Sequence, residues 1–541
     1  MDRSLVDVAA WNLPTLAWCI PLLGALFVFC CPKRWQAVLH RVTSCWMLLP
    51  FSVVAAMAMV LFSAGAGFYF EKQFFWDSLQ LGISSLPITY HVGVDGISLP
   101  LLLLAVVLFP IAAMVSRSVR GVTRGYYGLL LVLQSCTLGA LVAKDALLFF
   151  LFLEGTLLCM FFLIGKFGYL YRERAAFTYL IMGGVGSLFF LMALFMFLVY
   201  FESLDMEVIS DKLRQVAALR GVPELPEHLR AGYEGLLETF FWLVLIGLAV
   251  KLPVVPFHTW MVRTHMEAPL PVVLIHSGVL LKLGAYGFYR FIYNAFPTML
   301  DRYSHWLVIA GLVNLLYGAF VALSARKVRM LYGTPVALSA RKGFSWSSQG
   351  ARKIMAYASL SHMGIVLMGI GSLNSMGVEG SLYQLVGHGL TAAFAFLLIL
   401  YLEGRLETTY LREWDGLGAA LPRFAVGMRF LALALLGLPG LAGFVGEVLV
   451  FSGVIQTYPT VFPWVLVGFV LAAAYALRLA VRPTFGRPPV VNRTYGSDLA
   501  GNERVWLMIL GGLILLLGLW PDLLLHWFRP VVETFFSPTD R

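Results

Sequence analysis

The sequence predicts an all-α, polytopic membrane protein with about 14 transmembrane helices. Three observations point to this fold class. Of the 541 residues, 60% are hydrophobic and 13% are charged, whereas a soluble domain has about 45–50% and about 25%. The mean hydropathy is +0.83. The apolar residues form continuous runs of about 20, the length of a membrane-spanning helix, and not the alternating pattern of a β-barrel.

The composition also excludes several classes of protein. A soluble fold of this size cannot bury so much apolar surface. We therefore exclude a cytosolic enzyme, a disordered chain and a nucleic-acid-binding protein. The 39 Lys and Arg residues exceed the 29 Asp and Glu residues, which gives a net charge of +10. In a membrane protein such an excess reflects cytoplasmic loops.

The apolar runs place the expected spans along the chain. They lie near residues 12–31, 46–70, 98–116, 126–143, 146–165, 177–200, 235–257, 270–293, 304–323, 354–372, 380–403, 424–455, 461–481 and 504–520. With the N-terminus outside, the loops on the cytoplasmic side hold 24 of the 39 Lys and Arg residues and the opposite side holds 11. This bias predicts an even number of spans with both termini outside.

The spans divide the chain into four parts. We expect three N-terminal helices and a loop in residues 1–125, five-helix units in 126–293 and 304–481, and a C-terminal helix and tail in 482–541. The loop 324–353 is enlarged and basic, because Val-Ala-Leu-Ser-Ala-Arg-Lys at 321–327 recurs at 336–342. Such a duplication is either a tolerated surface insertion or a contact for a partner.

Four ionisable residues stand out inside the predicted spans, namely Glu154, Lys251, Lys282 and Glu447. A charge in the bilayer core is costly and is a functional hypothesis by default. Moving a carboxylate toward or away from a buried lysine would make that lysine load and release a proton. The residue types are therefore those of a proton pump, although Glu154 and Lys251 could also form a purely structural ion pair.

Spans seven and twelve are interrupted beside two of these charges. Pro253 and Pro256 follow Lys251, and the segment 437–440 (Gly-Leu-Pro-Gly) precedes Glu447. Proline removes a helical hydrogen bond and frees backbone carbonyls. Broken helices five spans apart suggest two inverted five-helix repeats, spans 4–8 and 9–13, each with a polar site. The alternative is that the breaks are packing kinks.

Histidines within or beside the spans add a possible proton relay. His388 and His362 lie on spans eleven and ten, and His276 lies with His258 and His265 around the start of span eight. A single histidine on an apolar helix can also be a satisfied core residue. The sequence contains no zinc-binding HExxH motif, no Cys/His cluster, no nucleotide-binding glycine motif and no haem-attachment motif. We therefore expect no metal, cofactor, nucleotide or nucleic acid to bind.

Six motifs in this order resemble the antiporter-like membrane subunits of NADH–quinone oxidoreductases, the respiratory complex I family. The motifs are GVDGISLP at 93–100, FLEGTL at 152–157, AVKLPVVPFHTW at 249–260, HMEAP at 265–269, GVLLKLGAYG at 278–287 and MAYASLSHMG at 355–364. The resemblance covers roughly residues 90–480.

The resemblance implies a role for each matching residue. Glu154 and Lys251 match the family's glutamate–lysine pair, and Lys282 and His388 match its central polar axis. Glu447 matches the proposed exit-side proton site. A glutamate there distinguishes the M-type member from the L and N types and from cation/proton antiporter subunits, which usually have lysine. His362 and His276 are further candidates for proton transfer.

The resemblance also implies partners and a location. The chain would be a proton-translocating subunit without redox chemistry of its own, beside L-, N-, K- and H-type subunits and a redox peripheral arm. It would lie in the inner (plasma) membrane. The alternatives are a subunit of a multi-subunit cation/proton antiporter, a subunit of a hydrogenase-type complex, and an inert spacer. The sequence departs from the family at residues 261–265, at His276 and in the loop 324–353.

Overall fold

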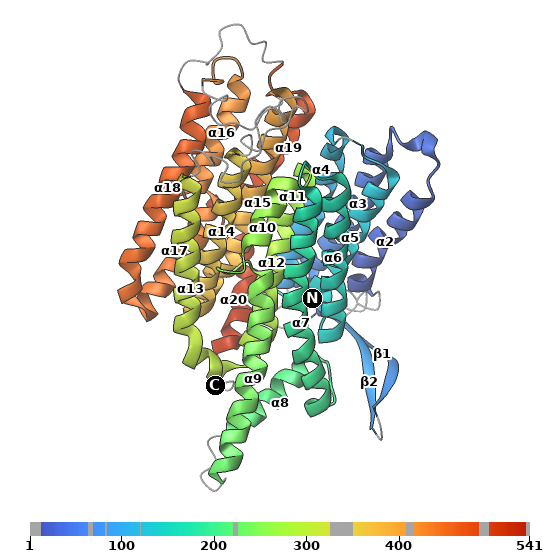
Figure 1. Ribbon diagram of the computed structural model, residues 1–541, viewed down its shortest axis with the longest axis vertical. Coiled ribbons are helices and arrows are strands. Elements are labelled where there is room, and N and C mark those ends of the chain that lie inside the picture. Colours follow the sequence, from blue (N-terminus) through green and yellow to red (C-terminus); the bar gives the residue numbers. More distant parts are fainter. Residues whose placement is uncertain are drawn as a thin grey trace.

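The computed structural model describes residues 12–62, 69–81, 84–119, 121–219, 226–324, 350–406, 416–485 and 497–536. Within this part of the chain, 13 helices are long and apolar enough to cross a membrane, and most run along the long axis of the molecule (Figure 1). The predicted polytopic helical fold is confirmed. The division of the chain into four parts and the inverted repeats stay predictions.

The helices that can cross a membrane follow the expected order. They are α2 (Leu13–Cys30), α3 (Leu39–Phe62), α4 (Ser98–Val115), α5 (Arg124–Val142), α6 (Ala146–Phe167), α7 (Arg172–Phe201), α9 (Glu227–Lys251), the segment from α11 to η5 (Leu270–Tyr293), α13 (Pro297–Ser324), α14 (Gly350–Gly371), α15 (Ser375–Leu406), α18 (Phe462–Thr484) and α19 (Gly501–Leu519). Residues 325–349, the larger part of the duplicated loop, lie outside the described residues.

The seventh span is broken where the sequence predicts. Helix α9 ends at Lys251, and α10 (Thr259–Glu267) begins after the two prolines. The side chain of Asn314 on α13 accepts a hydrogen bond from the Val255 amide (2.8 Å) and donates to the Pro253 carbonyl (3.3 Å). A neighbouring helix therefore satisfies backbone groups that the break releases, as lipid cannot.

The twelfth span is broken as well. It consists of α16 (Pro422–Leu435) and α17 (Ala442–Thr457), each shorter than a full span. In the connection, Gly437 has a φ of 67° and Gly440 a φ of 91°. Backbone in this left-handed region suits glycine, which has no Cβ to collide with the carbonyl oxygen. The break therefore follows from the local sequence.

The eighth span contains a feature that the sequence analysis did not predict. It passes through α11 (Leu270–Ile275), the π-helical turn η4 (His276–Leu280), α12 (Leu281–Gly287) and a second π-helical segment, η5 (Phe288–Tyr293). Its most apolar stretch is fully buried, and those of α14 and α15 are almost as deeply buried. These three spans form the centre of the molecule, and α11 and η4 pack against α15.

The fold also contains elements beyond the predicted spans. The strands β1 (Tyr69–Leu81) and β2 (Ser84–Val94) pair in an antiparallel hairpin. The prediction that the second span reaches residue 70 is therefore wrong, since α3 ends at Phe62. Tyr69 and Phe70, which end the predicted span, belong instead to β1, where Tyr69 pairs with Val94 of β2. Two short amphipathic helices, α8 (Met206–Leu219) and α20 (Asp522–Phe536), are also present.

These elements define the two ends of the molecule. We call the end with the β1–β2 hairpin and α8 the hairpin side, which lies at the bottom of Figure 1. The opposite end, where α13 ends and α14 begins, is the loop side. Helix α20 belongs to the hairpin side, because His526 contacts the carbonyl oxygen of Phe62 at the end of α3 (3.1 Å).

Candidate functional site

The structure places the seven predicted site residues on the inner faces of the membrane helices. Their positions are Glu154 on α6, Lys251 at the end of α9, His276 on η4, Lys282 on α12, His362 on α14, His388 on α15 and Glu447 on α17. Five of them are at most 5% exposed, and the side chains of Lys251 and Glu154 are 13% and 25% exposed. The predicted residues therefore form a buried polar set inside an apolar fold.

Glu154 and Lys251 form the predicted ion pair. The Lys251 ammonium donates to a Glu154 carboxylate oxygen at 3.2 Å and to the Ser187 hydroxyl at 2.8 Å. Ser187, on α7, also contacts the Glu154 carboxylate and the Gly183 carbonyl. The hydroxyl can accept from the ammonium and donate to the carboxylate, so it bridges the pair. The sequence analysis missed Ser187, although a polar residue in an apolar span was an available signal.

A small cavity lies beside this pair. Its volume is about 30 Å³, and Lys251 and His276 line it together with Tyr179, Gly183 and Trp260. A water molecule needs about 10–15 Å³ of such space and two or more polar partners. The cavity can therefore hold a water molecule between the Lys251 ammonium and the His276 ring.

The three histidines near span eight do not form a single cluster. Nε2 of His265 lies 3.0 Å from Nδ1 of His276, so one ring can donate a hydrogen bond to the other. The ring of His258 instead packs against Tyr317 and Tyr357. Only His265 and His276 are therefore placed to exchange a proton with each other.

Lys282 has two polar partners at the centre of the molecule. Its side-chain nitrogen lies 2.9 Å from Nδ1 of His388 and donates to the backbone carbonyl of Ser277. The π-helical turn explains the second contact, because there the Leu281 amide bonds to the carbonyl of His276, five residues back. Such π-turns occur often at functional sites.

A second row continues from His388 to Glu447. The ring centroids of His388 and His362 are 5.2 Å apart. Nδ1 of His362 lies 3.4 Å from a Glu447 carboxylate oxygen and 3.1 Å from the amide nitrogen of Gln384. Gln384 lies one turn before His388 on α15 and was not predicted. The row from Lys282 to Glu447 crosses four helices through titratable side chains.

Three further charged positions had no assigned role at the sequence level. Asp145 caps α6, since its carboxylate accepts from the amides of Leu147 (2.9 Å) and Leu148 (3.0 Å). Asp95 accepts two hydrogen bonds from the Arg290 guanidinium, at 2.7 and 2.5 Å, and also caps the start of α4. The segment 172–174 begins α7 and does not reach the buried row.

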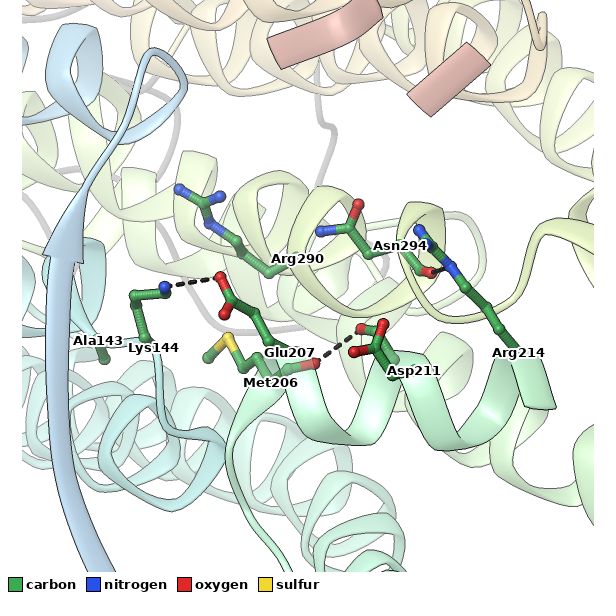
Figure 2. A pocket seen from close by; sticks show the side chains of 9 residues that line it. Ala143, Lys144, Met206, Glu207, Asp211, Arg214, Arg290 and Asn294 are labelled. Atoms are coloured by element: carbon green, nitrogen blue, oxygen red, sulfur yellow. Dashed lines mark hydrogen bonds and ion pairs between the residues drawn. The ribbon is translucent and has the colours of Figure 1, made fainter. Parts of the chain in front are cut away.

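A larger pocket lies on the hairpin side, outside the predicted site. Its volume is about 240 Å³, and its polar lining comes from Lys144, from α8 and from the end of the eighth span. Figure 2 shows Glu207 and Asp211 on α8, with Arg290 and Asn294 on the helix behind them. Arg214 on α8 donates to the Asn294 carbonyl at 2.8 Å.

A family model described as NADH:quinone oxidoreductase/Mrp antiporter, transmembrane, matches residues 143–334 and 344–473, more than half of the chain. The chain belongs to this family. Subunit M of the Rhodobacter capsulatus NADH-quinone oxidoreductase is 30% identical over 492 residues, which cover 90% of this chain and 89% of that protein. NADH-ubiquinone oxidoreductase chain 4 of Chondrus crispus is 30% identical over 526 residues and covers 96% of this chain and 97% of that one.

Chains in solved structures share the fold. A chain of respiratory complex I from Thermus thermophilus matches with a TM-score of 0.76 and 26% identity, covering 96% of this chain and 98% of that chain. A chain of the Mrp complex from Dietzia sp. DQ12-45-1b matches with a TM-score of 0.76 at 19% identity, covering 98% and 99%. The predicted membership of the antiporter-like family is confirmed, and the chain is a multi-pass membrane protein of a kind found in multi-subunit complexes.

Proposed function

We propose that this chain is the M-type, proton-translocating membrane subunit of an NADH–quinone oxidoreductase. The observation that carries the proposal is the buried row of titratable side chains. It begins at the Glu154–Lys251 pair and continues from Lys282 through His388 and His362 to Glu447. The names of the relatives support the assignment, since they are subunit M or chain 4 of such enzymes.

The Glu154–Lys251 pair is the element that loads and releases a proton. The Lys251 ammonium is stabilised while the carboxylate stays at 3.2 Å. A displacement of α6 relative to α9 that separates the pair would leave a buried charge without its partner, which is strongly unfavourable. Lys251 would then give its proton to the water-sized cavity, from which His276 can accept it.

From His276 the proton would pass to Lys282 and along the row to Glu447. Lys282 and His388 are in direct contact, so one transfer joins α12 and α15. Reorientation of the His388 and His362 rings would carry the proton toward the Glu447 carboxylate. The breaks beside Lys251 and Glu447 leave room for the backbone to adjust at both ends of the path.

The direction of transport follows from the distribution of charge. The Lys and Arg excess lies on the loop side, which we propose is the cytoplasmic side of the inner membrane. The hairpin side, where α2 begins and α20 lies, would face outward, and Glu447 would release protons there. His265, which contacts His276, would supply protons from the loop side.

The energy for this transport must come from partners. Moving one charge against 100 mV costs about 2.3 kcal/mol. We propose that the chain holds no metal, nucleotide or redox cofactor and is driven by a quinone-reducing peripheral arm, through L-, N-, K- and H-type membrane subunits. A cation/proton antiporter subunit is the weaker alternative, because the matching Mrp structure supports only the fold.

Purification of the tagged chain from its native membrane in mild detergent tests the proposal. We expect NADH-binding, iron–sulfur and quinone-site subunits to copurify with it. Copurification with antiporter-like membrane chains alone would overturn the assignment in favour of a secondary ion exchanger. Reconstitution of the purified complex in liposomes, with NADH and a quinone, would then show whether redox turnover drives proton uptake.

A further inference from the structure

Asp95 and Arg290 form a buried ion pair that the proposed proton path does not use. The two side chains are 2% and 5% exposed, and two hydrogen bonds of 2.7 and 2.5 Å join them across 195 residues of sequence. Burying two charges costs several kcal/mol, so a buried pair is weak evidence for a role in stability. The position of the pair suggests a different role.

The pair lies on the hairpin side of the central lysine. Lys282, Tyr286 and Arg290 follow one another at intervals of four residues along the eighth span. The Arg290 guanidinium lies 4.7 Å from the centroid of the Tyr286 ring. The Tyr286 hydroxyl donates to the Leu141 carbonyl at 2.8 Å, and the ring is 1% exposed. The route from Lys282 toward the hairpin side is therefore filled by a ring and an ion pair.

On the other face of the pair lies the polar pocket of the hairpin side. Arg290 lines this pocket together with Lys144, Glu207, Asp211 and other polar residues (Figure 2). A volume of about 240 Å³ can hold several water molecules, each of which occupies about 30 Å³ in the liquid. Tyr286 and the ion pair thus separate a water-accessible pocket from the buried Lys282.

We propose that the Asp95–Arg290 pair, with the Tyr286 ring, is a proton-tight seal on the hairpin side of Lys282. A guanidinium stays protonated at physiological pH, so it places a fixed positive charge in the path of an entering proton. Positive side chains exclude protons and cations from membrane pores in the same way. The Asp95 carboxylate fixes the position of the guanidinium.

A second contact keeps the seal in place. Asp95 also accepts hydrogen bonds from the amides of Ile97 and Ser98, at 3.1 and 2.9 Å, so the turn before α4 holds its carboxylate. Gly96 lies so close to the backbone of Trp527 on α20 that a side chain there would collide. Helix α20 therefore covers the turn that carries Asp95.

The seal rests on the proposed function, because only a proton-carrying row needs protection from the outer solution. A passive-leak assay tests it without redox turnover. The whole complex would be reconstituted in liposomes, and the decay of an imposed pH gradient would be followed with a pH-sensitive dye in the absence of NADH. We compare the wild type with Asp95→Asn, Arg290→Gln and Tyr286→Ala.

We expect Asp95→Asn, Arg290→Gln and Tyr286→Ala each to raise the passive proton conductance about tenfold, the effect of a barrier lowered by about 1.4 kcal/mol. Arg290→Lys keeps the charge and should stay tight. Arg302→Gln is the matched control, because Arg302 forms an exposed ion pair with Glu234 and Glu238, and it should also stay tight.

The outcomes separate the seal from other roles. Assembled variants that leak no faster than the wild type would overturn the proposal. Variants that lose NADH-driven transport without leaking would also overturn it, because that result would show that these residues carry protons rather than block them. If the ion-pair variants do not assemble, the leak rate of Tyr286→Ala tests the proposal, because this substitution leaves both charges in place. NADH-driven transport in Lys251→Ala tests the proposed function separately, since that variant should stop pumping and remain tight.

Discussion

The Lys282 ammonium lies 2.9 Å from Nδ1 of His388, although 106 residues separate the two in the sequence. The contact joins α12, in the first predicted five-helix unit, to α15, in the second. When Lys282 is protonated it can only donate to Nδ1, so a neutral His388 ring then carries its own proton on Nε2. The His388 ring lies tilted against the ring of His362, the next member of the row, with the ring centroids 5.2 Å apart. A proton leaving one unit can therefore enter the other at a single contact.

Removal of either member of the Glu154–Lys251 pair should stop coupled transport. We expect Lys251→Ala and Glu154→Ala to lower NADH-driven proton uptake and quinone reduction together by about tenfold or more, a barrier raised by about 1.4 kcal/mol, because either the lysine that loads the proton or the carboxylate that controls it is gone. The complex should still assemble, as shown by gel filtration. Lys166→Ala is the control, since Lys166 is exposed near the loop-side end of α6. Normal coupled activity in both pair variants would contradict the proposed path.

A side chain at Gly437 should disturb the Glu447 end of the row. Gly437 has a φ of 67°, and a Cβ added there would meet the Glu447 carboxylate. Gly437→Ala would therefore add about 1–2 kcal/mol of backbone strain and displace the carboxylate. We expect proton uptake per electron to fall while NADH oxidation by the peripheral arm persists.

Gly512→Ala provides the matched control for Gly437→Ala. Gly512 lies within α19 with open space beside it, since a Cβ added there would meet no atom within 4 Å. Alanine there should leave transport unchanged and raise helix stability by up to about 1 kcal/mol. Equal effects of the two substitutions on transport would show that Gly437 has no specific relation to Glu447.

The base of the β1–β2 hairpin should open with rising pH. Burial lowers the pKa of His91, but its contacts with Asp205 and Glu71 outweigh burial, so the pKa lies above the ordinary 6.5. Lys144, which also contacts Glu71, acts against this increase. A raised folded-state pKa means that the stabilisation is complete below about 6.5 and is lost as the pH rises through the folded value.

Asp205, the carboxylate that contacts His91, limits the stability of the hairpin base at low pH. Burial raises the pKa of Asp205, but the His91 contact outweighs it, so the pKa lies below the ordinary 3.8. Its stabilisation is complete above that ordinary value and is lost as the pH falls through the lowered folded value. The base of the hairpin should thus be most stable in mildly acidic solution.

Hydrogen exchange of the Lys144 amide measures this opening, because that amide donates to the His91 carbonyl at 3.0 Å. After correction for intrinsic rates, we expect its protection to fall between about pH 6.5 and pH 9. His91→Gln should remove the pH dependence, whereas His305→Gln, at an exposed position on α13, should keep it. Constant protection in the wild type over this range would contradict the prediction.

Arg352 should be needed for a stable loop side. Its guanidinium donates to both Glu403 carboxylate oxygens at 2.6 Å, to the Tyr169 hydroxyl at 2.7 Å, and to the carbonyls of Met266 and Ala268 at 3.2 Å. One side chain therefore ties α14 and α15 to the ends of α6 and α10. Glu403→Gln leaves this charge uncompensated, which costs about 3–5 kcal/mol.

We expect Glu403→Gln to lower the midpoint of thermal unfolding of the purified complex by several degrees and to reduce its yield. Glu234→Gln is the control, because the ion pair that it weakens is exposed and exposed pairs contribute about 0–1 kcal/mol. A Glu403→Gln variant as stable as the control would show that hydrogen bonds alone hold the Arg352 guanidinium.

Several parts of the fold could be predicted because local chemistry decides them. The apolar runs place the spans, since a bilayer demands a continuous apolar helix of fixed length. The prolines after Lys251 and the glycines before Glu447 mark both broken helices. The hairpin was missed because its aromatic residues continue the apolar run of α3, and only pairing with a second strand makes that segment a sheet.

The sequence by itself determined which residues carry the charge inside the membrane, because a buried Glu, Lys or His stands out against lipid-facing side chains by its cost alone. Only the tertiary structure decided which of them meet. Spacing along the chain does not show that Ser187 bridges Lys251 to Glu154, that His258 lies apart from His276, or that Asp95 pairs with Arg290. These contacts join helices far apart in sequence, and they form only when the packing of the whole bundle brings those helices together.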